Sequence, residues 1–242
     1  MLNEHTISIA RAYWAAHLGC SSDELFAEPF RLLAHGTELA DYCGVFALFR
    51  GGAVTASIPP DYADALRALL SSLPRGCSPE GFASALSSVS SAVIGPAYIG
   101  YAETAVRPEH PARALDPGDA VALDTLQQSC DTTEWEHGGS SIEQPCSAVF
   151  VGGRIAALAG YEVWGGRIAH ISIITHPGFR SRGFGRSAVA HLTGRVIAER
   201  LLPQYRTLQS NRASIRVAEL LGFHSYATSM AVRLNRTASQ EY

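Results

Sequence analysis

The residues between Ile171 and Ala190 have the types and spacing of an anion-binding site. The run ISIIT predicts a strand that Pro177 stops, and the loop before the next helix carries Arg180, Arg182, Gly183, Gly185 and Arg186. Glycine lets a backbone turn sharply and approach a ligand closely, and the N–H groups and positive dipole end of a starting helix favour phosphate. We therefore expect a site for a phosphorylated cofactor.

The distribution of charge supports an anionic ligand. The sequence has no lysine, so all 19 basic residues are arginine, which excludes a Schiff-base lysine and a Walker-type GK[ST] loop. Residues 1–166 hold 8 arginines and 19 acidic residues, whereas residues 167–242 hold 11 and 3. A basic C-terminal third suggests that the anion binds there. Nucleic acid is not expected, because basic patches interleaved with aromatic residues are not seen.

A dinucleotide fingerprint, GxGxxA, is also present as Gly183, Gly185 and Ala188. That fold expects an acidic residue about 20 positions later and several parallel βα units. The following segment, YRTLQS, has no acidic residue, and only about one such unit remains in the chain. A dinucleotide-binding protein is therefore the weaker alternative.

The elements that must position this loop lie in the second half of the chain. Residues 147–164 predict a hairpin about Gly152-Gly153, and residues 167–175 predict a third antiparallel strand. After Gly183 we expect a helix that Pro203 ends, then a strand over 205–210, a helix over 213–221 and a last strand over 225–234. Before the hairpin, residues 104–119 read as a linker, a helix begins at Pro117 or Asp119, and residues 130–145 are too polar for a buried element.

The first half of the chain contains no catalytic motif. We expect helices over residues 1–42, a hairpin over 44–60 about Gly51-Gly52, helices over 61–73 and 79–86, and an apolar run over 93–101. The chain is therefore predicted to be an α/β protein with an N-terminal lobe at 1–110 and a second domain at 111–242.

Composition bounds the class of protein. At 242 residues with 47% apolar and 17% charged residues, the chain should be an ordinary soluble protein. Its five cysteines form no CxxC pair, so neither a disulfide framework nor a metal site is expected, and a reducing cytoplasm fits best. The N-terminus has no signal-peptide pattern, and the uncharged run 81–102 is rich in serine and contains Pro96, so no membrane span is expected.

The order of hairpin strands, ITHPGFRSRGFG, helix, strand and NRASIRVAELLGF resembles the GNAT superfamily of acetyl-CoA-dependent N-acyltransferases, from about Leu115 to Leu234. Its signature, R/Q-x-x-G-x-G/A, is met by Arg180, Gly183 and Gly185, and the spacing from Asn211 to Gly222-Phe223 is a second match. The resemblance implies a mixed, mostly antiparallel sheet flanked by helices. It also implies that the N-terminal lobe is an acceptor-binding lobe or a degenerate copy of the same fold, as in a bacterial subgroup.

The resemblance also implies which residues hold acetyl-CoA. Backbone groups of Ile173, Ile174 and Thr175 would contact the pantetheine arm and thioester, and Asn211 would reach it from the other side. The pyrophosphate would be surrounded by Ser181, Arg182, Gly183, Phe184, Gly185 and Arg186, after the signature residue Arg180.

The implied reaction is attack of a neutral amine on the acetyl thioester, which needs a base, oxyanion donors and an acid for the leaving thiolate. Glu162 is the preferred base and Glu134 the second. The tyrosine that often supplies the acid is Ala218 here, and the acid that some members carry on the fifth strand is Arg206, which leaves Tyr226 or water. His170 and His176 are expected to face solvent or to satisfy the backbone.

We therefore predict an acetyltransferase acting on a small amine, without a metal, as a monomer or homodimer. Glu134, Glu136 and Glu162 suggest a cationic acceptor. The alternative is a non-catalytic acyl-CoA-binding regulatory module, which Ala218 motivates.

Overall fold

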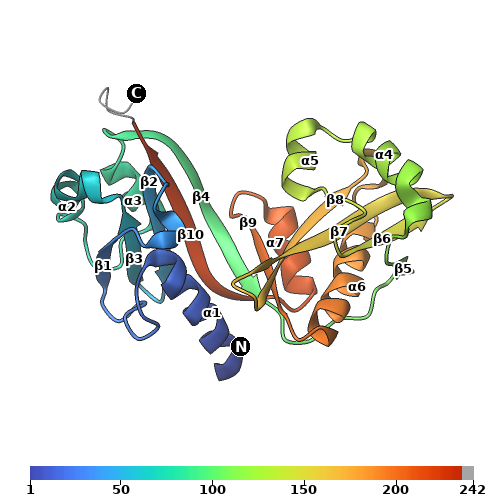
Figure 1. The fold of residues 1–242 in the computed structure, drawn as a ribbon, viewed down its shortest axis with the longest axis horizontal. Coiled ribbons are helices and arrows are strands. Elements are labelled where there is room, and N and C mark those ends of the chain that lie inside the picture. Colours follow the sequence, from blue (N-terminus) through green and yellow to red (C-terminus); the bar gives the residue numbers. More distant parts are fainter. Residues whose placement is uncertain (236–242) are drawn as a thin grey trace. The chain divides into compact units, whose positions relative to one another are not determined.

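The computed structural model describes residues 1–235, which form two compact units (Figure 1). The first unit comprises Asn3–Ile99, Thr207–Arg212 and 225–235, and the second comprises Met1–Leu2, Gly100–Arg206 and Ala213–His224. The boundary predicted at residue 110 stays a prediction. Residues 236–242 of the predicted second domain lie outside the described residues.

The first unit is built on a sheet with the strand order β1-β3-β2-β10-β4. Its strands are β1 (Phe30–Ala34), β2 (Gly44–Arg50), β3 (Ala53–Ile58), β4 (Ser90–Tyr101) and β10 (His224–Leu234). Its helices are α1 (Glu4–Leu18), α2 (Ala63–Leu70) and α3 (Pro79–Ala85), with short 3-10 turns η1 (Thr37–Leu39) and η2 (Pro60–Tyr62). Strand β2 pairs antiparallel with β3 about Gly51-Gly52, so this predicted hairpin is confirmed. Leu66, Leu70 and Phe82 are buried against the sheet.

The expectation that residues 1–42 are helical is wrong after α1. Gly19 ends α1 with a φ of 81°, and a Cβ on Gly19 would lie 2.9 Å from the backbone N of Gly36. The chain then returns as β1, which pairs in parallel with β3 from Phe30 opposite Val54 to Ala34 opposite Ile58. Such pairing depends on distant residues, which local periodicity does not reveal.

The second unit has the sheet order β9-β8-β7-β6-β5. Its strands are β5 (Ala112–Arg113), β6 (Cys146–Val151), β7 (Arg154–Trp164), β8 (Ile168–Thr175) and β9 (Leu202–Leu208). Its helices are α4 (Ala120–Ser129), α5 (Thr132–Gly138), α6 (Phe184–Ala198) and α7 (Arg212–Leu220), with η3 (Pro117–Asp119) and η4 (Pro177–Phe179). Strands β5 to β8 pair antiparallel and β8 pairs with β9 in parallel. The predicted fold class, a mostly antiparallel sheet flanked by helices, is confirmed.

The two faces of this second sheet are covered by different helices. Alternate side chains of a strand point to opposite faces. Leu158 and Ile174 pack in one cluster with Leu123 and Leu126 of α4 and with Trp135 of α5. On the opposite face, β6 meets α6, where Ser147 Oγ lies 2.8 Å from His191 Nδ1. The loop that follows β8 therefore leads the chain from the sheet to the helix on the second face.

The segment 130–145, whose sequence is described above as too polar for a buried element, contains α5. Asp131 caps this helix, because its carboxylate accepts from the backbone N–H groups of Thr133 and Glu134. Trp135 packs on the apolar cluster beneath α4, and Gly138 is buried at the end of the helix. A helix this short needs only one apolar anchor, which is too little to produce a visible helical period.

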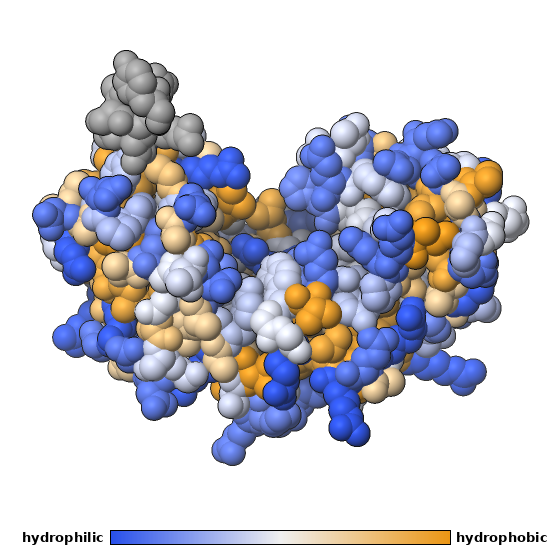
Figure 2. All heavy atoms as spheres, viewed as in Figure 1, coloured by the Kyte–Doolittle hydropathy of each residue, from blue (hydrophilic) through white to orange (hydrophobic). Residues whose placement is uncertain are grey.

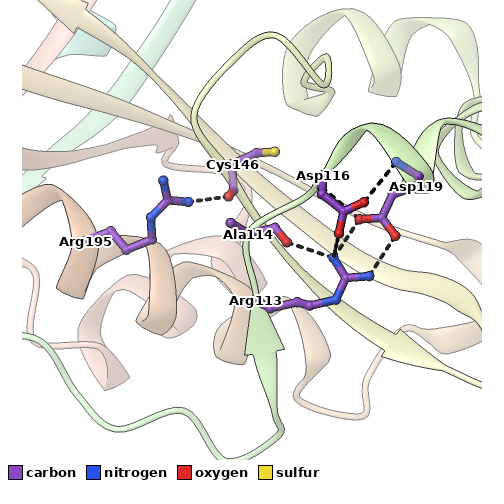
Figure 3. Close-up of polar contacts among 7 residues, drawn as sticks. Arg113, Ala114, Asp116, Asp119, Cys146 and Arg195 are labelled. Atoms are coloured by element: carbon purple, nitrogen blue, oxygen red, sulfur yellow. Dashed lines mark hydrogen bonds and ion pairs between the residues drawn. The ribbon is translucent and has the colours of Figure 1, made fainter.

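Strand β5 lies inside the predicted linker, held by a cluster of charged groups (Figure 3). Arg113 donates to both carboxylate oxygens of Asp119, at 2.6 and 2.7 Å, and this hydrogen bonding keeps the pKa of Asp119 below its usual range. Asp119 also accepts from the backbone N–H of Asp116, which fixes the start of α4. Arg195 of α6 donates to the carbonyl oxygen of Cys146 at 2.6 Å and so ties α6 to β6 (Figure 3).

The viewed face of each unit is mainly hydrophilic, with smaller apolar areas between the polar ones (Figure 2). Among residues 1–235, no helix is both long enough and apolar enough to cross a membrane. The same residues contain no group of three or more His, Cys, Asp or Glu side chains placed to hold a metal ion.

Candidate functional site

The parallel strands β8 and β9 pair over only part of their length. Their register begins with Ile168 opposite Leu202 and ends with Ile171 opposite Tyr205. From Ser172 to Thr175, β8 keeps β7 as its pairing partner on the other side. Within residues 1–235, the backbone edge of Ile173 to Thr175 that would face β9 therefore has no strand paired with it.

Gly138, at the end of α5, lies against this part of β8. A Cβ built on Gly138 would overlap the carbonyl oxygen of Ile173 and would lie 3.5 Å from the Cβ of Ile174. Backbone atoms cannot move aside as a flexible side chain can, so only glycine fits at position 138.

The loop after β8 forms a tight turn into α6. His176 Nδ1 accepts from the backbone N–H of Gly178 at 3.0 Å, and the backbone N–H of Phe179 donates to the His176 carbonyl. Ser181 and Gly183 both have left-handed backbone conformations, with φ of 62° and 80°. The loop therefore delivers the chain to the first turn of α6, whose leading N–H groups have no partner within the helix.

Gly185 lets α6 start in contact with β8. A Cβ at this position would lie 2.8 Å from Thr175 Oγ1 and 3.0 Å from Ile173 Cδ1. The two features predicted to hold different parts of one ligand, the edge of β8 and the first turn of α6, are thus adjacent.

Two of the loop arginines have carboxylate partners that the sequence did not indicate. Arg180 donates to both oxygens of Glu134, at 2.9 and 2.7 Å, and Arg186 donates to Glu109. The guanidinium carbon of Arg182 lies 5.9 Å from the centre of the Phe179 ring. Of the two carboxylates predicted as bases, Glu134 therefore has both oxygens bonded to Arg180.

A second polar group lies on the face of the sheet that α4 and α5 cover. His170 Nδ1 is 3.1 Å from Gln204 Oε1, and Gln204 Nε2 donates to the Tyr101 hydroxyl at 2.8 Å. Trp164 stacks on the His170 ring with centroids 3.9 Å apart. Burial, with a further contribution from Arg206, lowers the pKa of His170 to about 4, so the ring is neutral near pH 7.

The histidine expectations have different outcomes. His176 satisfies the backbone, as predicted. His170 does not: it is partly buried and bonded to a buried side chain, Gln204. Sequence reasoning missed Gln204, Tyr101 and Trp164. The only signal for this group was Gln204 itself, a glutamine that follows Pro203 near the start of β9.

Glu162 of β7 is exposed and lies directly opposite His170 in the register of β7 and β8. Directly opposed side chains on neighbouring strands share a face and have Cβ atoms roughly 5 Å apart. Glu162 and His170 are therefore neighbours on one face of the sheet, whereas Glu134 is paired with Arg180 of the loop.

The remaining predicted residues lie in other places. Asn211 is grouped with the first unit, and its backbone N–H donates to the Leu208 carbonyl at 3.0 Å. Ala218 is fully buried in α7. Tyr226 also belongs to the first unit, and burial raises its pKa to about 12.

The sequence profile described as the acetyltransferase (GNAT) family matches residues 116–223. No curated protein sequence matches the chain at a significant level.

Solved structures give a second comparison. An acetyltransferase from the GNAT family of Colwellia psychrerythraea aligns with a TM-score of 0.52 and 10% identity, over 97% of this chain and 98% of its own. A protein from Novosphingobium aromaticivorans DSM 12444 assigned to the same family aligns with a TM-score of 0.49 and 24% identity, over 61% and 67%. A Salmonella typhimurium protein solved with its cofactor acetyl-CoA aligns with a TM-score of 0.40 and 16% identity, over 53% and 95%.

At 10% identity the likeness to the Colwellia structure shows the fold alone, and the residues that the profile matches include β8, the glycine loop and α6. Residues 116–223 of this chain thus match a GNAT acetyltransferase family domain, and the fold of that neighbour agrees with the match.

Proposed function

We propose that the second unit binds acetyl-CoA and transfers its acetyl group to the primary amine of a small, cationic acceptor. One observation carries the proposal: the pairing of β8 with β9 stops at Ile171 and Tyr205, beside a glycine loop that opens α6. An extended thioester arm needs an open strand edge, and its pyrophosphate needs a helix N-terminus next to that edge. The profile match over residues 116–223 supports the same assignment.

The residues of the site fit acetyl-CoA chemically. Backbone groups of Ile173 to Thr175 would hold the pantetheine arm and thioester, and residues 181–186 would surround the pyrophosphate. Arginine is well suited to phosphate because its planar guanidinium can donate two parallel hydrogen bonds. Arg182 and Arg186 supply this charge.

In the proposed reaction the amine nitrogen bonds to the acetyl carbon, the carbon–sulfur bond breaks, and the amine gives up a proton. Glu162 would attract the ammonium group of an acceptor and accept its proton, because it is exposed on β7 next to β8. His170 next to it is neutral near pH 7 and does not repel a cation. The leaving thiolate takes a proton from water.

We further propose that the first unit is either an acceptor-binding lobe or a degenerate copy of the same fold, and the hairpins favour the copy. Its β2–β3 hairpin turns at Gly51-Gly52 with φ of 58° and 83°, and the β6–β7 hairpin turns at Gly152-Gly153 with φ of 56° and 76°. The first unit has no RxxGxG loop. We place the protein in the cytoplasm, as a monomer or homodimer.

A non-catalytic acyl-CoA-binding module is the second candidate. It is favoured by Ala218, which is fully buried and cannot protonate a thiolate. Calorimetric titration with acetyl-CoA, followed by an assay of CoA thiol release with polyamines, amino sugars and amino acids, separates the two candidates. Binding with thiol release supports the transferase, binding without release over the whole panel supports the module, and no binding contradicts both.

A further inference from the structure

We propose that residues 107–110, the strap, control the access of phosphate to the loop 182–187. In this proposal Glu109 is an internal counter-ion that the ligand's phosphate must replace on Arg186, and His110 is the anchor that holds the loop in shape. The inference rests on the proposed function, because it concerns the same acetyl-CoA site.

His110 contacts the loop at three points. Its backbone N–H donates to Ser187 Oγ at 3.1 Å, and its Nε2 lies 3.1 Å from the carbonyl oxygen of Arg182. A carbonyl only accepts, so this nitrogen carries the hydrogen. The His110 ring also packs on Phe184, with centroids 4.5 Å apart. One residue of the strap thus fixes both ends of the turn into α6.

Glu109 places a negative charge over the turn itself. Its carboxylate forms an ion pair with Arg186 of α6. A Cβ built on Gly183 would lie 3.4 Å from Glu109 Oε2 and 3.5 Å from His110 Nε2, so the strap crosses directly over this glycine. A carboxylate therefore lies where the phosphate of the ligand is expected, and two anions cannot share one arginine without repulsion.

The strap is held in a way that allows displacement. The Glu109 side chain is 59% exposed although it is paired, whereas that of Arg186 is 29% exposed. A cavity of about 110 Å³ lies between residues 107–109 of the strap, α6 and the last turn of α7, so this part of the strap, unlike His110, does not pack closely on the helices. Exposed ion pairs contribute little free energy, and a phosphate ligand carries more charge than the carboxylate it replaces.

The two strap residues should therefore have opposite effects on ligand binding. Glu109→Gln removes the competing charge and should tighten acetyl-CoA by about two- to fivefold, the factor that corresponds to an exposed ion pair. His110→Ala removes three contacts that shape the loop and should weaken acetyl-CoA binding. A strap with a merely structural role would give weaker binding in both variants.

The test is calorimetric titration of acetyl-CoA into the full chain and its variants. Glu143→Gln is the matched control, because Glu143 is an exposed glutamate outside the loop and the strap. Thermal unfolding reports whether His110→Ala is folded, and His110→Gln, which keeps a donor for the Arg182 carbonyl, should lose less affinity than His110→Ala.

A double-mutant cycle with Arg186→Gln shows whether Glu109 acts through that arginine. If Glu109 competes with the ligand for Arg186, Glu109→Gln tightens acetyl-CoA binding in the native background but not in the Arg186→Gln background. Unchanged or weaker acetyl-CoA binding in Glu109→Gln, or an equal gain in both backgrounds, contradicts the proposed role of the strap. Acetyl-CoA binding by the native protein would still support the proposed function in that case. If acetyl-CoA does not bind to the native protein, both the proposed function and the proposed role of the strap are contradicted.

Discussion

Arg180 of the glycine loop donates to both carboxylate oxygens of Glu134, the third residue of α5, at 2.9 and 2.7 Å. Arg180 also reaches back to the carbonyl of Thr175, at 3.4 Å from Nε. Arg180 thus links the end of β8 to α5. The sequence predicts separate roles for these two residues, Arg180 in the anion-binding loop and Glu134 as the second base, but in the structure they form one ion pair.

This contact predicts different roles for the two carboxylates. Glu162→Gln should lower kcat/KM for the acceptor by roughly 100-fold or more, since a positioned general base contributes about 10²–10⁴-fold. Glu134→Gln should change turnover much less, because Arg180 rather than the acceptor uses that group. Steady-state kinetics of the two variants with one active amine test this. Equal losses in both variants, or a larger loss in Glu134→Gln, would contradict the assignment.

Gly185→Ala should weaken acetyl-CoA binding by roughly tenfold or more, since overpacking at a contact costs about 1–3 kcal/mol. The added Cβ would lie 2.8 Å from Thr175 Oγ1 and would push the first turn of α6 away from β8. The matched control is Gly194→Ala in the same helix, whose Cβ would lie an ordinary 3.6 Å from that of Ala105. If both variants bind acetyl-CoA with the native affinity, the close approach of α6 to β8 has no part in the site.

Gly138→Ala should destabilise the fold by about 1–3 kcal/mol, because the new Cβ would overlap the carbonyl of Ile173. Urea unfolding measures the change. Gly81→Ala, within α3, is the control. Its Cβ would lie an ordinary 3.6 Å from the Oγ of Ser78, the N-cap of that helix. A native midpoint for Gly138→Ala would show that α5 does not rest against β8 as described.

The stability of the protein should fall as the pH is lowered from about 6.5 to about 4. The pKa of His170 is lowered from 6.5 to about 4 by burial and by Arg206, so the unfolded chain binds a proton in this window that the folded chain does not. The stabilisation is complete above pH 6.5 and is lost on acidification. His170→Gln cannot titrate and should show a smaller drop in Tm between pH 7 and pH 5. Identical drops in both proteins would show that His170 is not shielded from protonation.

The sequence predicted those parts of the fold that depend on local patterns. Turns at Gly51-Gly52 and Gly152-Gly153 marked both hairpins, and Pro177 with Gly183 marked the passage from β8 to α6. Strand β1 was missed because the strand that it pairs with, β3, comes later in the chain.

The contacts that define the site could not be predicted in the same way. Arg180 and Glu134 are 46 residues apart, and Arg186 and Glu109 are 77 apart. No periodic pattern links such positions, so the pairing of each arginine follows only from the folded sheet and the segments that cross it. His170 and Gln204 met for the same reason, through the parallel pairing of β8 with β9.

The most direct test of acetyl transfer is an end-point assay with acetyl-CoA and a panel of polyamines and amino sugars, in which free CoA thiol and acetylated amine are both quantified. The proposed function predicts that the native protein forms the two products in equal amounts and that Gly185→Ala forms far less of each. Thiol release without acetylated amine, or no release from a protein that binds acetyl-CoA, would contradict it.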